Sequence, residues 1–443
     1  MRYLPHTDSD IAAMLKAIGV DSTDDLFANI PEAARSSREM DLPPAMSEWE
    51  MRAYMERLAA ESPDHKIFLG AGKYDHYIPA TVTNLLERSE LLTSYTPYQP
   101  EVSQGTLQAV YEYQTLTARL LGLEISNASM YDGASALAES LLMATRIRKK
   151  SKGKIVLSSL IHPSYCQVVK TYFRPTPFEI TFLPVLADGR TDVSALADMG
   201  DVVAVAVQSP NFLGCVEDLA GFGDLVTQTK AIFVTCFTEP LAYGLYQPPG
   251  GQGADIACGE GGSLGLPPGY GGPGLGMLAT KMDYVRRMPG RVVGKTTDAN
   301  GKDGFVLTLA TREQHIRRAR ATSNICTNSN FCAIAAAVYM ACLGKTGFRE
   351  LARLNYDKTE YLKQQLRRAG MTLPFGAPTF NEFVVKLPPD FKRKYADLAA
   401  SGGIVAGLPL ADWYPELADH YLLCVTEKIT RADMDQLVKE VSE

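Results

Sequence analysis

Two stretches of this chain are apolar at almost every position rather than at alternate positions. They are "VVAVAV" (202–207) and "AIFVTCF" (231–237). Strands that are apolar on both sides are typical of a parallel sheet covered by helices on both faces. The runs "KIVLSSL" (154–160) and "EITFLPV" (179–185) also read as strands. One helical run lies between these two, and another lies between 202–207 and 231–237. The pattern therefore predicts a large α/β domain with a mainly parallel sheet.

The two ends of the chain follow a different pattern. Near the start, "DSDIAAMLKAIGV" has helical apolar spacing and ends at Gly19, and Ser47 and Glu50 have the spacing of a capping box. After residue 340, long helical runs alternate with strands whose polar and apolar residues alternate. We expect an N-terminal helical arm (1–65), the large α/β domain (66–340) and a small C-terminal α+β domain (341–443).

Composition and charge exclude several classes of protein. The 443 residues are 46% hydrophobic and carry a formal net charge of −6, which gives no general attraction to nucleic acid. No apolar run reaches the length that spans a bilayer, and the start lacks a signal peptide's apolar core, so we expect a cytoplasmic protein without a membrane partner. The eight cysteines form no CxxC pair and the six histidines are scattered, so we expect buried reduced thiols and no metal site.

Three short segments follow predicted strands or open a predicted helix. "YDGASALAES" (131–140) begins a helix whose free N–H groups suit a phosphate, although tight packing explains its small residues equally well. His162 in "HPSY" and Asn211 in "QSPNFLG" follow strands at the sheet edge where α/β folds keep their ligands. A capping histidine and an ordinary turn are the plainer interpretations.

Two polar segments near residues 70–105 are candidate site walls. "SYTPYQPEVSQG" holds Tyr95, Tyr98 and Gln99 between prolines that restrict the backbone, which fits a site wall or a subunit contact. "LGAGKYDHYIPATV" holds His76 in a polar cluster, for which a solvated loop is the alternative. The glycine-rich stretch "GEGGSLGLPPGYGGPGLG" (259–276) lacks lysine, histidine and aspartate, and Pro273 interrupts any dinucleotide fingerprint.

Taken in order, "YLPHTDSDIAAML", "YTPYQPEVSQG", "NASMYDGASALAE", "HPSY", "QSPNFLG", "GGSLGLPPGYGGPGLG" and "LLCVTEK" resemble one family over essentially the whole length. This is the glycine decarboxylase family, the pyridoxal-phosphate P-protein of the glycine cleavage system, and specifically its alpha chain where the enzyme is split in two. The resemblance implies a fold-type I, aspartate aminotransferase-like architecture. It also implies partners: a beta subunit, the lipoylated H-protein and, functionally, the T- and L-proteins.

The same resemblance places two altered positions in this chain. The aspartate that holds the cofactor's ring nitrogen in the active chain falls on Thr235, and the Schiff-base lysine falls on Ser263. Without them this chain is expected to bind no pyridoxal phosphate covalently, and the beta subunit holds the cofactor. Two alternatives stay open: a self-sufficient enzyme that uses Lys281, and a purely structural or regulatory subunit.

Overall fold

The computed structural model describes residues 5–36, 38, 40–62, 64–92, 96–400 and 403–442. These residues form two compact units, 1–63 and 64–443. The first unit contains α1 (Asp8–Ile18), the 3₁₀ helices η1 (Asp24–Phe27) and η2 (Glu32–Ala34), and α2 (Glu48–Ala60). The expected capping box is present at α2, where the N–H of Ser47 donates to Oε2 of Glu50 over 2.8 Å.

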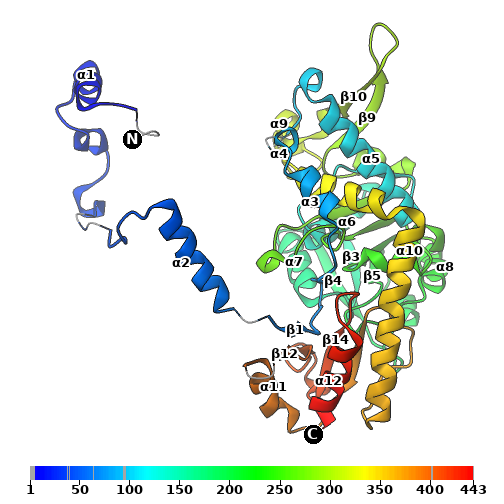
Figure 1. Cartoon of the computed structure of the whole chain (residues 1–443). Helices are drawn as coiled ribbons and strands as arrows, with labels where there is room; N and C mark the ends of the chain where they lie inside the picture. The colour runs from blue at the N-terminus through cyan, green and yellow to red at the C-terminus, as the bar shows by residue number, and fades with distance from the viewer. Residues whose placement is uncertain are drawn as a thin grey trace. The chain divides into compact units, whose positions relative to one another are not determined.

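A seven-stranded sheet forms the centre of the second unit (Figure 1). Its order is β2-β8-β7-β6-β5-β3-β4. The strands are β2 (Ile125–Ser126), β3 (Gly153–Ser158), β4 (Phe178–Leu183), β5 (Val202–Gln208), β6 (Ile232–Phe237), β7 (Ile256–Glu260) and β8 (Gly276–Thr280). The five strands from β7 to β4 are parallel, and β8 runs antiparallel to β7 and β2. The predicted parallel-rich sheet is therefore confirmed.

Alternate residues of the central strands enter different cores. Ile155 and Leu157 of β3 belong to the core beneath α6 (Gly133–Arg148) and α7 (Pro163–Phe173), whereas Val156 between them belongs to the core beneath α8 (Leu219–Thr229). Both faces of the sheet are thus buried by helices, which explains why β5 and β6 are apolar at almost every position. Six of the eight cysteines are buried, and Cys326 and Cys342 are exposed.

Helix α10 (Asn330–Arg368) covers the β7–β8 side of the sheet together with α5 (Gln104–Leu121) and η5 (Pro240–Gly244). Among the described residues it is the one helix whose length and hydropathy would suit a membrane, with a mean hydropathy of 1.5 over 18 residues. This corrects the expectation that no apolar run reaches such a length. The apolar residues of its first turns are buried against α5 and η5, as in the core helix of a globular domain.

The C-terminal residues build a second, smaller layer of structure. An antiparallel sheet of order β11-β14-β13 packs against α12, and β1 pairs with β12. The elements are β1 (Lys66–Ile67), β11 (Glu382–Lys386), α11 (Phe391–Ala400), β12 (Ile404–Val405), β13 (Leu408–Pro409), η11 (Pro415–Leu417), β14 (His420–Cys424) and α12 (Arg431–Ser442). The expected boundary between residues 340 and 341 falls inside α10, and the three-domain division stays a prediction.

The remaining elements connect these layers. They are α3 (Ala80–Leu86), α4 (Ser89–Leu92), η3 (Pro100–Val102), η4 (Val193–Asp198), η6 (Pro249–Gln252), η7 (Gly269–Gly271), η8 (Met282–Arg287), the hairpin β9 (Val292–Thr297) and β10 (Asp303–Thr308), η9 (Ala310–Arg312), α9 (Gln314–Arg317) and η10 (Arg318–Arg320). The glycine-rich stretch is the connection between β7 and β8, which pair antiparallel on either side of it.

Candidate functional site

The carboxyl ends of the parallel strands meet the amino terminus of α6. Asp132 is the N-cap of this helix, and its Oδ1 accepts the N–H of Ser135 over 2.8 Å. Glu260, the last residue of β7, lies beside the same helix terminus. The ends of open parallel strands and the free N–H groups of a helix are where α/β folds bind anions. This edge of the sheet is therefore the candidate site.

Glu260 fills that position with its own carboxylate. Its Oε2 accepts the N–H of Gly133 over 3.1 Å, and its Oε1 accepts the N–H groups of Gly262 and Leu275 over 3.0 and 2.8 Å. Burial raises the pKa of this carboxyl, against the lowering effect of the three N–H bonds and of Lys73. Glu260 and Asp132 together use two of the first three N–H groups of α6.

Tyr165 of α7 closes the space beside Glu260. A Cβ placed on Gly133 would overlap the Tyr165 hydroxyl, so the phenol lies directly against the helix terminus. The Tyr165 ring also lies 5.1 Å from the His162 ring and packs in one core with Cys236 and Cys258. Burial raises the pKa of Tyr165 well above its ordinary value. The terminus of α6 is thus covered by a neutral ring as well as a carboxylate.

The residues present do not fit the pyridoxal phosphate that the resemblance implies. A covalently held cofactor needs an amine for its aldehyde, a carboxylate for its ring nitrogen and N–H donors for its phosphate. Ser263 is buried in the turn after β7, and Thr235 lies within β6 with a buried hydroxyl that has no partner among the described residues. At the start of α6, Glu260 accepts the N–H of Gly133 and Asp132 accepts the N–H of Ser135. The assignment of Thr235 and Ser263 as replaced cofactor residues stays a prediction.

Lys281 lies at the opposite edge of the sheet. Its Nζ pairs with Oδ1 of Asp255 over 2.6 Å, and Asp255 directly precedes β7, whereas Ser263 follows it. Lys281 therefore lies at the other end of β7 from Ser263, the position that the resemblance gives to the Schiff-base lysine. Lys73 instead lies beside the turn after β7, since a Cβ on Gly262 would be 3.4 Å from its Nζ.

Of the predicted site wall, Tyr98 and Gln99 are exposed, and Tyr95 lies outside the described residues. The Tyr98 hydroxyl accepts a 2.9 Å hydrogen bond from Nη2 of Arg291, whose guanidinium carbon lies 5.1 Å from the centre of the Tyr98 ring. Gln99 precedes η3, and its exposed side chain has no hydrogen bond within the part of the chain that the structure describes. The contacts of Arg291 thus give Tyr98 a fixed orientation, and Gln99 has no such contact among the described residues.

Arg291 connects this segment to the start of α6. It is 3% exposed and also donates to Oγ1 of Thr96 over 3.1 Å and to the carbonyl of Cys326 over 2.7 Å. The N–H of Cys326 in turn donates to the hydroxyl of Tyr131, two residues before α6. No carboxylate pairs with Arg291 in the described part of the chain.

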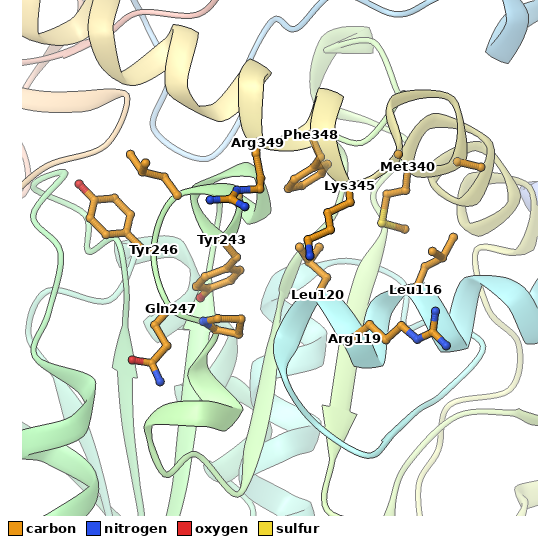
Figure 2. A pocket seen from close by; sticks show the side chains of 15 residues that line it. Leu116, Arg119, Leu120, Tyr243, Tyr246, Gln247, Met340, Lys345, Phe348 and Arg349 are labelled. Atoms are coloured by element: carbon orange, nitrogen blue, oxygen red, sulfur yellow. The ribbon is translucent and has the colours of Figure 1, made fainter.

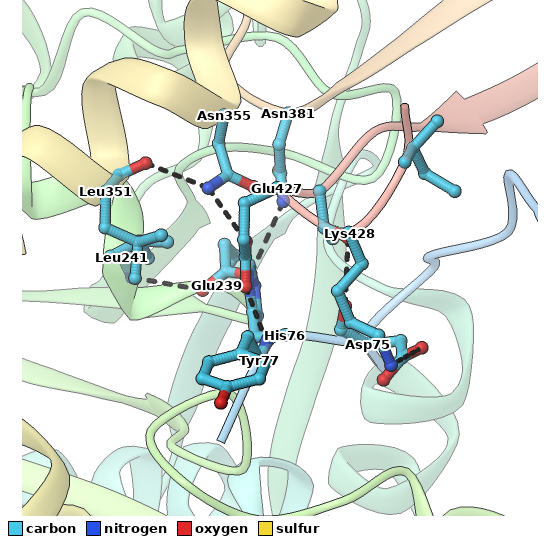
Figure 3. Close-up of polar contacts among 12 residues, drawn as sticks. Asp75, His76, Tyr77, Glu239, Leu241, Leu351, Asn355, Asn381, Glu427 and Lys428 are labelled. Atoms are coloured by element: carbon cyan, nitrogen blue, oxygen red, sulfur yellow. Dashed lines mark hydrogen bonds and ion pairs between the residues drawn. The ribbon is translucent and has the colours of Figure 1, made fainter. Parts of the chain in front are cut away.

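His76 is buried and forms ion pairs with two carboxylates, so it does not line a site wall as expected (Figure 3). Its Nε2 lies 2.8 Å from Glu239 and its Nδ1 lies 2.8 Å from Glu427. Burial opposes protonation, but the charge of Glu239 and the hydrogen bonds that the ring donates to both carboxylates outweigh it and raise the pKa of His76 to about 10. Asn355 of α10 adds a 3.0 Å bond to Glu427. Both ring nitrogens are used, so His76 offers none to a ligand.

Asn211 and His162 are likewise engaged within the fold. The Asn211 amide donates to the Gly189 carbonyl and to Glu217, and its Oδ1 accepts the N–H groups of Leu213 and Cys215. These contacts shape a turn, in agreement with the plainer interpretation. His162 caps α7, and its Nε2 lies 3.0 Å from the Ala71 carbonyl.

A separate cavity of about 740 Å³ lies between α5, η5 and α10 (Figure 2). Its wall is mainly apolar, and three cations line it: Arg119 from α5 and Lys345 and Arg349 from α10. Gly344 interrupts α10 at this point with φ 58° and ψ −175°, a conformation that only glycine adopts readily. None of the residues proposed from the sequence lines this cavity.

Three residues of the site were missed by reasoning from the sequence. Glu260 is the one carboxylate in the glycine-rich stretch, and its position at a strand end was the available signal. Tyr165 stands in the noted "HPSY" motif, but nothing in the sequence shows that its ring reaches Gly133. Arg291 in "MPGRVVG" gives no local signal, because its partners lie 35 to 195 residues away.

Solved structures share this architecture. A glycine decarboxylase (P-protein) of the glycine cleavage system, in inhibitor-bound form, superposes with a TM-score of 0.90 at 42% identity, covering 100% of this chain and 99% of that one. A sphingosine-1-phosphate lyase from Burkholderia pseudomallei superposes with a TM-score of 0.64 at 14% identity, covering 93% of each chain. The expected fold of the fold-type I pyridoxal-phosphate enzymes is confirmed.

Sequence relatives match over the full length. The probable glycine dehydrogenase (decarboxylating) subunit 1 of Desulfotalea psychrophila is 53% identical and covers 100% of this chain and 98% of its own. The protein of the same description from Geobacillus kaustophilus is 46% identical and covers 100% of this chain and 99% of its own. The family model of the glycine cleavage system P-protein matches residues 1–441. This chain therefore belongs to the glycine cleavage system P-protein family.

Proposed function

We propose that this chain is subunit 1 of a two-chain glycine dehydrogenase (decarboxylating). The observation that carries the proposal is the full-length identity of 53% to a relative of that description. The word "subunit" in the relatives' names supports a second chain as partner. In the assembled enzyme, glycine loses its carboxyl group as CO2 and its aminomethyl group passes to the lipoyl group of the H-protein, with the T- and L-proteins acting afterwards.

The cofactor chemistry belongs to the second subunit in this proposal. Pyridoxal phosphate supplies an electron sink for the decarboxylation when it is bound. In this chain Ser263 has no amine, and Glu260 and Tyr165 fill the terminus of α6. Two arguments therefore support a cofactor bound by the partner. Glu260 and Tyr165 fill the terminus of α6 in this chain, and the resemblance places the Schiff-base lysine on the second subunit.

This chain's own contribution is to orient the reacting groups. Tyr98 and Gln99 are exposed polar side chains on a proline-braced segment, and Arg291 fixes the Tyr98 ring. Such fixed donors and acceptors hold a substrate or a lipoyl arm in the geometry that reacts, which lowers the entropy lost in the transition state. The cytoplasmic location expected from the sequence remains part of the proposal.

A purely structural or regulatory subunit is the competing proposal. The contacts of His76 and Asn211 are structural, and they favour neither proposal. The difference between the proposals lies in the segment 96–102 alone. Substitutions there that leave assembly intact lower activity only if the segment faces the reacting groups.

The test is reconstitution of the two chains. We expect H-protein-dependent release of CO2 from glycine only when this chain and the second subunit are combined, together with co-elution on size exclusion. Glycine decarboxylation by the second subunit alone at the rate of the pair, or by this chain alone, contradicts the proposal. A Lys281→Ala variant that assembles and keeps full activity excludes the self-sufficient alternative.

A further inference from the structure

The amino terminus of α6 carries two features that normally belong to an anion site. It is the start of a 16-residue helix, and its first N–H group, that of Gly133, points toward the carboxyl end of β7. Free N–H groups and the helix dipole there favour a phosphate or a carboxylate. In this chain the negative group comes from the protein itself, because Oε2 of Glu260 accepts the Gly133 N–H.

The geometry around Glu260 is that of a bound anion. Three N–H groups from three separate segments converge on its carboxylate: Gly133 at the helix start, Gly262 in the turn after β7, and Leu275 before β8. The residue is 6% exposed. Lys73 adds a positive charge whose attraction favours the ionised form of Glu260. Three donors and a cation are the surroundings that a phosphate group requires.

We propose that the carboxylate of Glu260 is a built-in substitute for a phosphate at the terminus of α6, and that its removal opens an anion site there. The inference rests on the proposed function and deepens it, because it gives a physical reason why this chain leaves the phosphate cofactor to its partner. Restoring a lysine at Ser263 would then be insufficient for cofactor binding. The carboxylate must also leave, since two anions cannot share these donors.

The experiment compares phosphate binding by full-length variants. Glu260→Ala removes the carboxylate and leaves room at the three donors. Glu217→Ala is the matched control, because Glu217 is also buried and accepts a backbone N–H, that of Thr191 over 3.0 Å, but away from the start of α6. The probes are inorganic phosphate, pyridoxal phosphate and pyridoxal, with chloride at equal ionic strength as the reference.

We expect about 20 mM phosphate to raise the thermal midpoint of Glu260→Ala by about 2 °C, through binding to the folded state alone. The native chain and Glu217→Ala should shift by less than half of that. Pyridoxal phosphate should act as phosphate does, and pyridoxal should have no effect. A Glu260→Ala protein that is folded and indifferent to both phosphates overturns the proposal.

Hydrogen exchange keeps the proposal testable if Glu260→Ala does not fold. Glu260→Gln preserves the side-chain volume but removes the charge, so the Gly133 N–H loses a charge-assisted bond. We expect exchange in the peptide 131–138 of this variant to be about tenfold faster than in the native chain, because the net difference between charged and neutral bonds is about 1.4 kcal/mol. Unchanged exchange in this peptide overturns the proposal. Neither readout needs the second subunit, so both are independent of the proposed function.

Discussion

Arg291 and Tyr98 are 193 residues apart in the sequence, yet Nη2 of Arg291 donates a 2.9 Å hydrogen bond to the Tyr98 hydroxyl. The same guanidinium carbon lies 5.1 Å from the centre of the Tyr98 ring. Tyr98 is 60% exposed, whereas Arg291 is buried. A buried cation therefore holds an exposed phenol in one orientation at the surface.

Tyr98→Phe is expected to lower glycine decarboxylation by the assembled enzyme about ten- to hundredfold. The loss of one hydrogen bond to a charged or bound group costs about 1–3 kcal/mol, which corresponds to that range of rates. The assay is H-protein-dependent CO2 release, with size exclusion to confirm assembly. Tyr77→Phe is the control, because Tyr77 is 64% exposed and its hydroxyl has no hydrogen bond among the described residues. Equal activity of the two variants contradicts the orienting role.

Gln99→Ala is expected to lower activity without lowering the stability of the chain. Gln99 is exposed, so its removal should change the free energy of unfolding by no more than about 0.5 kcal/mol. If its amide contacts a substrate or a lipoyl arm, decarboxylation should nevertheless fall about tenfold. Urea unfolding of the chain and the CO2 assay of the complex measure the two quantities. Full activity in an intact complex would assign the segment to the subunit interface alone.

His76→Gln is expected to lower the free energy of unfolding by about 3–5 kcal/mol near pH 6. The substitution leaves Glu239 and Glu427 buried without their cation. The loss should depend on pH. The pKa of His76 rises from 6.5 to about 10 on folding, so its contribution is complete below pH 6.5 and is lost as the pH rises toward 10.

The contribution of Glu427 to the free energy of unfolding changes with pH in the opposite direction. Burial raises the pKa of Glu427, but its hydrogen bond and attraction to His76 dominate and lower it from 4.5 to about 2. The contribution of Glu427 is therefore complete above pH 4.5 and is lost as the pH falls toward 2. Urea unfolding of the native chain and His76→Gln should differ most between pH 4.5 and 6.5. An equal difference at pH 6 and pH 10 would rule out a protonated His76.

The sequence was sufficient for elements that depend on local pattern. The almost wholly apolar strands predicted at 202–207 and 231–237 are β5 and β6, because burial on both faces favours apolar residues at nearly every position. The site could not be predicted in the same way. Glu260 reaches Gly133 across 127 residues, and only the paired strands β7 and β8 bring its carboxylate to α6. His76 was expected at a site wall for the same reason, since its two carboxylate partners are remote in sequence.

Gly259→Ala is expected to disrupt the sheet beside the site. A Cβ at Gly259 of β7 would overlap the carbonyl oxygen of Phe237 in β6, and that backbone cannot move without breaking the pairing. We expect a loss of more than about 3 kcal/mol in the free energy of unfolding, which is the upper end of the range typical of overpacked cores. Gly105→Ala in α5 has open space around its Cβ and should be neutral or stabilising by up to about 1 kcal/mol. Thermal unfolding of both variants checks the contrast, and a stable Gly259→Ala protein would contradict it.

Borohydride reduction of the assembled two-chain enzyme tests the central claim most directly. The enzyme is saturated with pyridoxal phosphate, reduced, digested and mapped by mass spectrometry, so that each lysine bound to the cofactor is located. The account predicts a pyridoxyl-lysine on the second subunit and none on this chain, where Ser263 follows β7 and Glu260 occupies the terminus of α6. A stoichiometric pyridoxyl group on Lys281 or Lys73 of this chain would contradict it.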